Sequence, residues 1–178
     1  MSTHQSIFLI GPMGSGKSAV GRRLAAQLGW EFCDSDAIIE DRTGVDIAFI
    51  FEKEGEDGFR RREQQVIFEL TERKQIVLAT GGGAILTAEN RKCLGSLGTV
   101  IYLQASVEQQ LKRTRHGKER PLLKGGDRRQ FLQELMKMRD PLYREIADML
   151  VETDGRTVAV VTTEICENLG DSSNGLRE

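Results

Sequence analysis

One eight-residue motif constrains this chain more than any other feature. Residues 11–18 read G-P-M-G-S-G-K-S and match the phosphate-binding loop pattern G-x-x-x-x-G-K-[ST] at every fixed position. The motif follows an apolar run at residues 7–10 and precedes an amphipathic stretch, as a loop between a strand and a helix would. Its glycines let backbone N–H groups turn toward phosphates, Lys17 supplies positive charge, and the Ser18 hydroxyl is placed to bind Mg²⁺. A purely structural turn would not explain the Lys-Ser pair, so we expect the chain to bind a nucleoside triphosphate.

Outside this motif, short β-like runs alternate with helical patterns. Such alternation is typical of an α/β fold in which helices cross over between the strands of a parallel sheet. Val20, Leu24 and Leu28 recur every four residues after the loop, which predicts a helix with one apolar stripe against the sheet. The candidate strands are residues 6–10, 31–33, 76–80, 99–103 and 149–152.

Further helices are expected from local patterns. A longer helix before the third strand is marked by Phe59, Val66, Ile67 and Leu70. Ser106 and Gln109 form a capping box that predicts a helix after the fourth strand. Another helix is expected over residues 127–139, with Pro141 at the start of a following helical turn.

Length and composition fit one small enzyme domain over residues 1–178. The net charge of −2 excludes a global field directed at nucleic acid or an anionic membrane. No apolar run forms a signal peptide core or approaches the roughly 20 residues of a membrane span. We expect a monomer with a frayed polar tail at 170–178. An odd number of widely spaced cysteines without a C-x-x-C pair favours a reducing compartment, the cytoplasm, and these are Cys33, Cys93 and Cys166.

Two segments do not fit the bare sheet-and-helix plan, and the second is strongly basic. The first covers residues 34–63. The second, residues 112–129, holds eight Lys or Arg against two acidic residues and is interrupted by glycines and a proline. This composition predicts a mobile lid, over about 112–126, that closes over a triphosphate. A solvated loop or a nucleic-acid patch would also be basic, but the segment from Arg113 to Arg129 offers no aromatic ring for base stacking.

The acidic pair in Asp34-Ser35-Asp36 directly follows the second candidate strand. Because the carboxyl ends of parallel strands face the ligand crevice, these carboxylates should lie beside the bound phosphates. Asp34 could hold a magnesium-bound water, and Asp36 could accept or orient the proton of an attacking hydroxyl. The alternative is that the motif only caps a helix over residues 37–40.

A run of three glycines, Gly81, Gly82 and Gly83, follows the third strand. No acidic residue occurs over residues 76–83, where many phosphate-loop proteins place a Walker B aspartate, and this disfavours motor-type ATPases. Three successive glycines favour a loop that a ligand approaches closely, although a tight turn could use one or two of them.

Two arginines outside the lid complete the candidate site. A guanidinium group binds a carboxylate through two parallel hydrogen bonds, so Arg60 and Arg139 together with Asp36 would suit a hydroxylated carboxylate. Spacing alone leaves open whether the arginines converge, and each could instead be a surface residue or an ion-pair partner.

These motifs together resemble the shikimate kinase family. They occur in the order and spacing of that family and leave only the polar tail unmatched. The matching segments are residues 11–18, 34–36, 55–60, 80–83, 119–123 and 139–147. The resemblance implies a three-layer, nucleoside monophosphate kinase-like fold with a five-stranded parallel sheet, an acceptor-binding segment at about 33–63 and a mobile lid. It implies transfer of the ATP γ-phosphoryl group to the 3-hydroxyl of shikimate, in aromatic amino-acid biosynthesis.

The resemblance also implies the residues that bind ATP and Mg²⁺. The phosphates are wrapped by Gly14, Ser15, Gly16, Lys17, Ser18 and Ala19. Lys17 neutralises developing charge, and the lid residue Arg120 reaches the triphosphate. Ser18 binds Mg²⁺ and Asp34 assists its ligand shell. Adenine is flanked by Arg113 and Arg156.

On the acceptor side, the resemblance implies that Asp36 binds the reacting hydroxyl and acts as the base. Arg60 and Arg139 clamp the carboxylate of shikimate, and the turn formed by Gly81, Gly82 and Gly83 binds the acceptor. Catalysis then rests on Lys17, Asp36 and Arg120. No covalent intermediate is required, because positioned oxygens react in line and cations stabilise the spread negative charge.

Three alternative functions compete with this one. A gluconate kinase or another small-molecule kinase would keep the loop and lid but need not combine Asp36, Arg60 and Arg139. A nucleotide-switch GTPase is suggested by D-R-T-G at residues 41–44, but the chain contains no N-K-x-D motif to read guanine. A non-catalytic shikimate-binding protein is disfavoured because the expected catalytic residues are all present.

Overall fold

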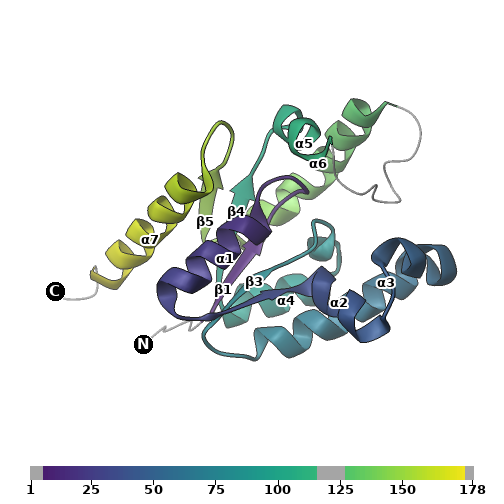
Figure 1. Cartoon of the computed structure of the whole chain (residues 1–178), viewed down its shortest axis with the longest axis horizontal. Helices are drawn as coiled ribbons and strands as arrows, with labels where there is room; N and C mark the ends of the chain where they lie inside the picture. The colour runs from purple at the N-terminus through teal and green to yellow at the C-terminus, as the bar shows by residue number, and fades with distance from the viewer. Residues whose placement is uncertain (1–5, 116–126, 175–178) are drawn as a thin grey trace.

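The computed structural model describes residues 6–115 and 127–174, with side chains as far as 170. Its centre is a five-stranded sheet in the order β2-β3-β1-β4-β5, and all neighbouring strands are parallel (Figure 1). The strands are β1 (Ile7–Ile10), β2 (Glu31–Asp34), β3 (Ile76–Ala79), β4 (Thr99–Gln104) and β5 (Met149–Glu152). The predicted α/β fold with five parallel strands is confirmed, and the expected strand ends differ from these by at most one residue.

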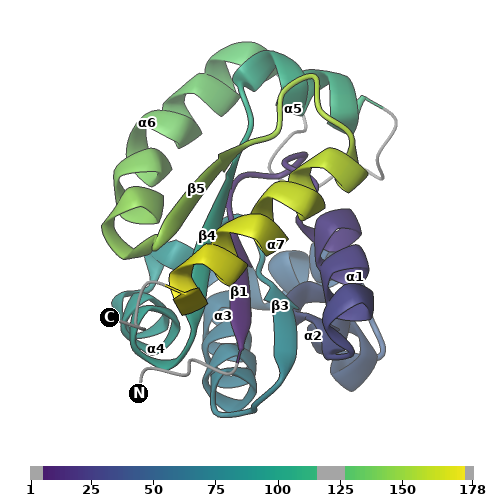
Figure 2. The ribbon, with the colours of Figure 1, turned by 90° about the vertical axis from the view of Figure 1, so that its left-hand side faces the viewer.

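Helices cover both faces of this sheet and complete the three layers. They are α1 (Lys17–Leu28), α2 (Ser35–Thr43), α3 (Ile47–Thr71), the 3₁₀ helix η1 (Ala84–Leu86), α4 (Ala88–Leu97), α5 (Val107–Thr114), α6 (Arg128–Ile146) and α7 (Val158–Asn174). Side chains alternate along β1, because successive strand residues point to opposite faces. Ile7 and Leu9 pack with residues of α1 and α7, whereas Phe8 and Ile10 pack with α3 and α4. Figure 2 shows α7 crossing in front of the strands, with α3 behind them.

The register of the strands places three of the sequence motifs at one edge of the sheet. Asp34, the last residue of β2, pairs with Ala79, which in turn pairs with Leu9 on the other side. The phosphate-binding loop follows β1 and the glycine run follows β3, so both begin at the level of Asp34. This juxtaposition of the carboxyl ends is what assembles the candidate site.

Two local expectations differ from the structure. Pro141 lies inside α6, which is one continuous helix, so the expected break there is wrong. Leu132, Arg139 and Tyr143 are all buried along that helix, and their packing outweighs the hydrogen bond that proline cannot donate. The Ser106 side chain accepts from the Gln109 N–H at 3.1 Å as a capping box predicts, but the Ser106 N–H donates to Asp154 instead of Gln109.

Two helix ends also differ from expectation. The segment at 170–178 is helical as far as Asn174, because α7 continues there, and residues 175–178 lie outside the described residues. The helix expected over 37–40 begins earlier, at Ser35. None of the helices in the described ranges 6–115 and 127–174 is both long enough and apolar enough to cross a membrane.

Candidate active site

The phosphate-binding loop leads directly into α1. Gly16 precedes the helix in a left-handed conformation, with φ of 89°, which favours glycine. Lys17 is the first helical residue, and its Nζ donates to the carbonyl oxygens of Gly11 and Pro12, both at 2.8 Å. The lysine charge is therefore held against the loop, at the N-terminus of a helix, where anions bind favourably.

Asp34 joins this loop to the next motif. Its Oδ2 accepts a 2.9 Å hydrogen bond from the Ser18 hydroxyl, while its Oδ1 accepts from the N–H groups of Asp36 at 3.0 Å and Ala37 at 3.1 Å. Asp34 thus caps α2 and also contacts the phosphate-binding loop, so the two interpretations of the acidic pair are compatible. Ser18 and Asp34 supply hard oxygen donors, and Mg²⁺ commonly takes one or two protein oxygens together with substrate phosphates. The pair fits a magnesium ion.

The glycine turn after β3 is the meeting point of the other predicted residues. A Cβ atom at Gly81 would lie 2.8 Å from Oδ1 of Asp36, and at Gly83 it would lie 2.3 Å from a terminal nitrogen of Arg60. At Gly82 it would lie 3.5 Å from a terminal nitrogen of Arg139. Each of the three glycines therefore faces a different predicted acceptor-binding side chain, and at Gly81 and Gly83 only the missing Cβ allows the approach.

Both arginines are largely buried at this turn. The Arg60 side chain is 16% exposed and donates to Glu63 at 2.8 Å and to Glu56 at 3.2 Å. Arg139 is 6% exposed, and its Nε has no hydrogen-bond partner among residues 6–115 and 127–170, whose side chains are described. The structure thus brings together the two arginines, whose convergence the sequence left open, and Arg60 is also an ion-pair partner.

Glu63 is a member of this cluster that the sequence interpretation missed. Its carboxylate is fully buried between Arg60 and the turn, with Oε2 3.1 Å from the Cβ position of Gly81. Burial raises the pKa of Glu63 from 4.5 to about 7; Arg60 opposes this shift, and Asp36 adds to it. A signal was present, because Glu63 occupies the helical stripe that Phe59, Val66 and Leu70 line with apolar side chains.

The predicted adenine-side arginines lie near Thr153, which follows β5. Arg113, near the end of α5, donates to the carbonyl oxygens of Gly14 at 2.8 Å and Thr153 at 3.0 Å. The Arg156 N–H donates to the same Thr153 carbonyl, and its side chain pairs with Glu164. Arg113 therefore connects the phosphate-binding loop to the end of β5. Arg120 and residues 116–126 of the predicted lid lie outside the described residues.

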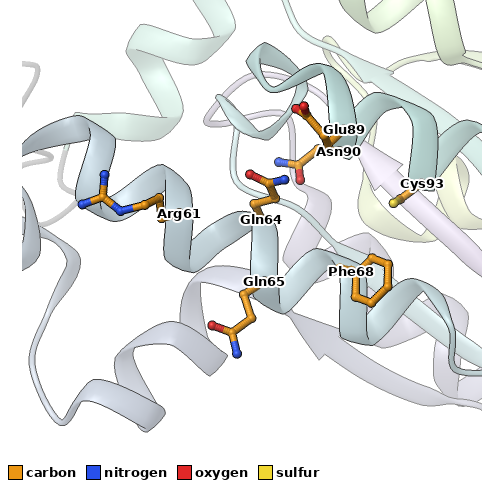
Figure 3. Close-up of a pocket in the computed structure, with 7 residues that line it drawn as sticks. All are labelled: Arg61, Gln64, Gln65, Phe68, Glu89, Asn90 and Cys93. Carbon is orange, nitrogen blue, oxygen red and sulfur yellow. The ribbon is translucent and has the colours of Figure 1, made fainter.

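A surface groove of about 290 Å³ lies apart from this site, between α3 and α4 (Figure 3). It contains none of the predicted site residues. Its lining is formed by Arg61, Gln64, Gln65, Phe68, Glu89, Asn90 and Cys93. The candidate active site is therefore defined by its side chains and not by this hollow.

Comparisons with known proteins point to one family. The family model for shikimate kinase matches residues 13–170. A curated shikimate kinase of Haemophilus influenzae (strain PittEE) is 52% identical over 177 residues, which is 99% of this chain and 98% of that relative.

Solved structures agree with this similarity. A shikimate kinase from Acinetobacter baumannii in complex with shikimate has a TM-score of 0.93 and 51% identity, and the match covers 98% of this chain and 97% of the other. A gluconokinase from Sinorhizobium meliloti 1021 has a TM-score of 0.57 and 21% identity over 94% of this chain and 97% of its own, so it shares the fold alone.

Proposed function

Because this chain belongs to the shikimate kinase family and is an enzyme of that family, we propose how its residues share the transfer of the γ-phosphoryl group of ATP to the 3-hydroxyl of shikimate. The products are shikimate 3-phosphate and ADP. The observation that carries the assignment of residues is the glycine turn, where Asp36, Arg139 and Arg60 each approach a different glycine. One acid and two guanidinium groups at one turn are the groups that recognise a hydroxylated carboxylate.

Arg60 and Arg139 bind the carboxylate of shikimate in this proposal. Their terminal nitrogens approach Gly83 and Gly82, so both guanidinium groups lie at the same turn. Glu63 and Glu56 hold Arg60 in place, which lowers the entropy that its side chain loses when the acceptor binds. The two-pronged geometry of each arginine fixes the orientation of the acceptor ring.

Asp36 binds the 3-hydroxyl and accepts or orients its proton. Its carboxylate lies against Gly81, and its N–H is fixed by Asp34, so the side chain starts from a rigid helix N-terminus. A base held at hydrogen-bond distance from the attacking oxygen contributes about 10²–10⁴-fold to a rate. The capping role of Asp34 thus positions Asp36 for its chemical role.

On the donor side, residues 14–19 wrap the ATP phosphates with backbone N–H groups. Lys17 exchanges its hydrogen bonds to the loop carbonyls for phosphate oxygens and neutralises the charge that develops during transfer. Arg113 and Arg156 flank the adenine. Arg120 stabilises the triphosphate from the lid, an assignment that rests on the family resemblance.

We assign magnesium to the Ser18 hydroxyl and to the Asp34 side chain, which assists its ligand shell. The ion would neutralise phosphate oxygens and hold the triphosphate in place. The 2.9 Å contact between Ser18 and Asp34 supports this assignment, because it puts both oxygens beside the phosphate-binding loop.

A coupled ADP-release assay tests the function. We expect ADP release that depends on magnesium and is stimulated strongly by shikimate and little by gluconate or nucleoside monophosphates. Gluconate is the informative control, because the gluconokinase from Sinorhizobium meliloti 1021 is similar to this chain in fold alone. Equal stimulation by gluconate, or none by shikimate, would overturn the assignment.

We further propose a monomer of one domain in the cytoplasm, acting on ATP and shikimate without nucleic acid or membrane partners. The balanced net charge of −2 supports the absence of a nucleic-acid partner. Cys33, Cys93 and Cys166 are all free thiols, in keeping with a reducing compartment. Size-exclusion chromatography with light scattering would test the oligomeric state.

A further inference from the structure

Four charged side chains surround the glycine turn, and Glu63 is the one to which no contact with shikimate has been assigned. The charged groups around Glu63 come from its own helix and from two other helices. Arg60 and Glu56 lie on its own helix, Asp36 comes from α2, and Arg139 comes from α6. Arg60 and Arg139 balance the formal charges of Asp36 and Glu63, so this inner group is neutral before any acceptor enters.

The two oxygens of Glu63 have different surroundings. Oε1 accepts the 2.8 Å hydrogen bond from Arg60. Oε2 is buried and has no hydrogen-bond partner among the side chains described, over residues 6–115 and 127–170. It lies 3.1 Å from the Cβ position of Gly81, and Oδ1 of Asp36 lies 2.8 Å from that same point. The two carboxylates therefore face each other across the missing side chain of Gly81.

Resting on the proposed function, we propose that Glu63 takes up one proton from solvent, on Oε2, when the carboxylate of shikimate binds Arg60. The incoming anion shares the guanidinium that compensates Glu63, and it brings a third carboxylate into a buried cluster. A buried anion that loses part of its compensation favours its neutral form. The protonated side chain still accepts from Arg60 through Oε1, so the arginine keeps its position.

The energetics permit this change near neutral pH. The pKa of Glu63 is about 7, raised mainly by burial and opposed by Arg60. When shikimate weakens the interaction of Glu63 with Arg60, the pKa of Glu63 rises further. Between about pH 7 and this higher pKa, shikimate binding must therefore be accompanied by proton uptake. Linkage then requires that shikimate binds more weakly as the pH rises through this range, by up to about tenfold per pH unit.

Isothermal titration calorimetry of shikimate binding tests the proposal. Titrations at pH 7.5 in buffers of different ionisation enthalpy give the number of protons taken up. We expect a clear uptake, of at most about one proton per shikimate, in the wild-type protein and in Glu56→Gln, and little uptake in Glu63→Gln. Glu56→Gln is the matched control, because it removes the half-exposed partner of Arg60 and keeps the buried one.

Two results would overturn the proposal: no proton uptake in the wild type, or unchanged uptake in Glu63→Gln. Unchanged uptake would show that a group other than Glu63 takes up the proton. If Glu63→Gln does not fold, ¹³C NMR of labelled glutamate side chains replaces it. One carboxyl resonance must then titrate near neutral pH and move to its protonated position with shikimate; if none does, the proposal is wrong. Failure of the proposed function is distinguishable, because the wild type would then neither bind nor phosphorylate shikimate.

Discussion

Asp36, Arg60 and Arg139 approach the turn at 81–83 so closely that a methyl group on any of its glycines would contact one of them. Neighbouring acidic side chains hold two of these residues in position. Asp34 fixes the backbone of Asp36, and Glu63 holds Arg60. Substitutions at these side chains should therefore separate acceptor binding from phosphate binding.

Asp36→Asn should lower kcat far more than it weakens ATP binding. The change removes a charged acceptor from the attacking hydroxyl and leaves the phosphate-binding loop intact, so a loss of about 10²–10⁴-fold in kcat is expected. Steady-state kinetics with both substrates provide the measurement. A kcat within about threefold of the wild type, well short of that range, would reduce Asp36 to a residue of the first turn of α2.

Arg60→Lys and Arg139→Lys should each raise the KM for shikimate more than the KM for ATP. Lysine conserves the charge but cannot form two parallel hydrogen bonds to a carboxylate. The double variant should lose less than the sum of the single losses, with a coupling of about 0.5–3 kcal/mol, because both residues share one partner. Strict additivity, or an effect confined to ATP, would contradict a shared carboxylate.

Gly83→Ala should raise the KM for shikimate with little loss of stability. The new Cβ would lie 2.3 Å from a terminal nitrogen of Arg60, which is the flexible end of a long side chain and can move away. The φ of Gly83 is −96°, so alanine introduces no backbone strain. Kinetics and thermal unfolding of the same variant separate the effects, and a large fall in Tm at unchanged KM would contradict the prediction.

Among the secondary-structure elements, α3 carries Arg60 and Glu63 and contains a kink. Gly55 interrupts the helix with φ of 71°, a conformation that favours glycine. The Glu54 carboxylate reaches across the kink and accepts from Arg62 at 2.7 and 2.9 Å. Its Cβ lies 2.4 Å from the Cβ position of Gly58, so the stem of Glu54 occupies the space where a side chain at 58 would be. The motif G-E-D-G-F-R thus sets the direction from which Arg60 approaches the turn.

Gly58→Ala should destabilise the protein, by about 1–3 kcal/mol, because the added methyl group meets the stem of Glu54 and not a flexible end. Chemical denaturation gives the free energy of unfolding. Gly95→Ala is the matched control: it also lies in a helix, but its nearest contact would be an ordinary 3.7 Å from Ile146. The control should be neutral or slightly stabilising, since alanine favours a helix by about 0.5–1 kcal/mol over glycine. Equal effects at both positions would contradict the packing argument.

For the molecule as a whole, the buried Glu63 couples stability to pH. Its pKa is raised from 4.5 to about 7, so the folded protein binds this proton more tightly than the unfolded chain does. The contribution of the protonated Glu63 to the free energy of unfolding is therefore fully present below about pH 4.5. It is lost as the pH rises through about 7.

The free energy of unfolding of the wild type, relative to Glu63→Gln, should accordingly fall between pH 4.5 and 8, by about 3 kcal/mol. Glutamine does not titrate, so the Glu63→Gln variant is the reference for the wild type at each pH. Urea denaturation of both proteins at several pH values supplies the measurement. A difference that is constant with pH would show that Glu63 does not titrate in this range.

Local patterns were sufficient to predict the five strands, the phosphate-binding loop and the parallel sheet. Helical and strand periodicity are read from neighbouring residues, and the loop motif needs only eight consecutive positions. For the same reason, the capping contact at Ser106 was predictable, because its partner lies three residues away. The roles of individual residues in the reaction stay predictions until the variants are measured.

Long-range packing decided which site residues meet, where α6 ends and how deeply Glu63 is buried. Arg60, Gly82 and Arg139 belong to α3, the turn after β3, and α6, so nothing in their spacing could show that they meet. Pro141 reads locally as a helix start, yet burial of Tyr143 and Arg139 on either side of it keeps α6 continuous. The sequence places Glu63 on the apolar stripe of its helix but does not show which groups surround it. Its buried state, and with it the pKa near neutrality, exists only because α2, α6 and the glycine turn close around it, since desolvation depends on the atoms that replace water and not on neighbours in the chain.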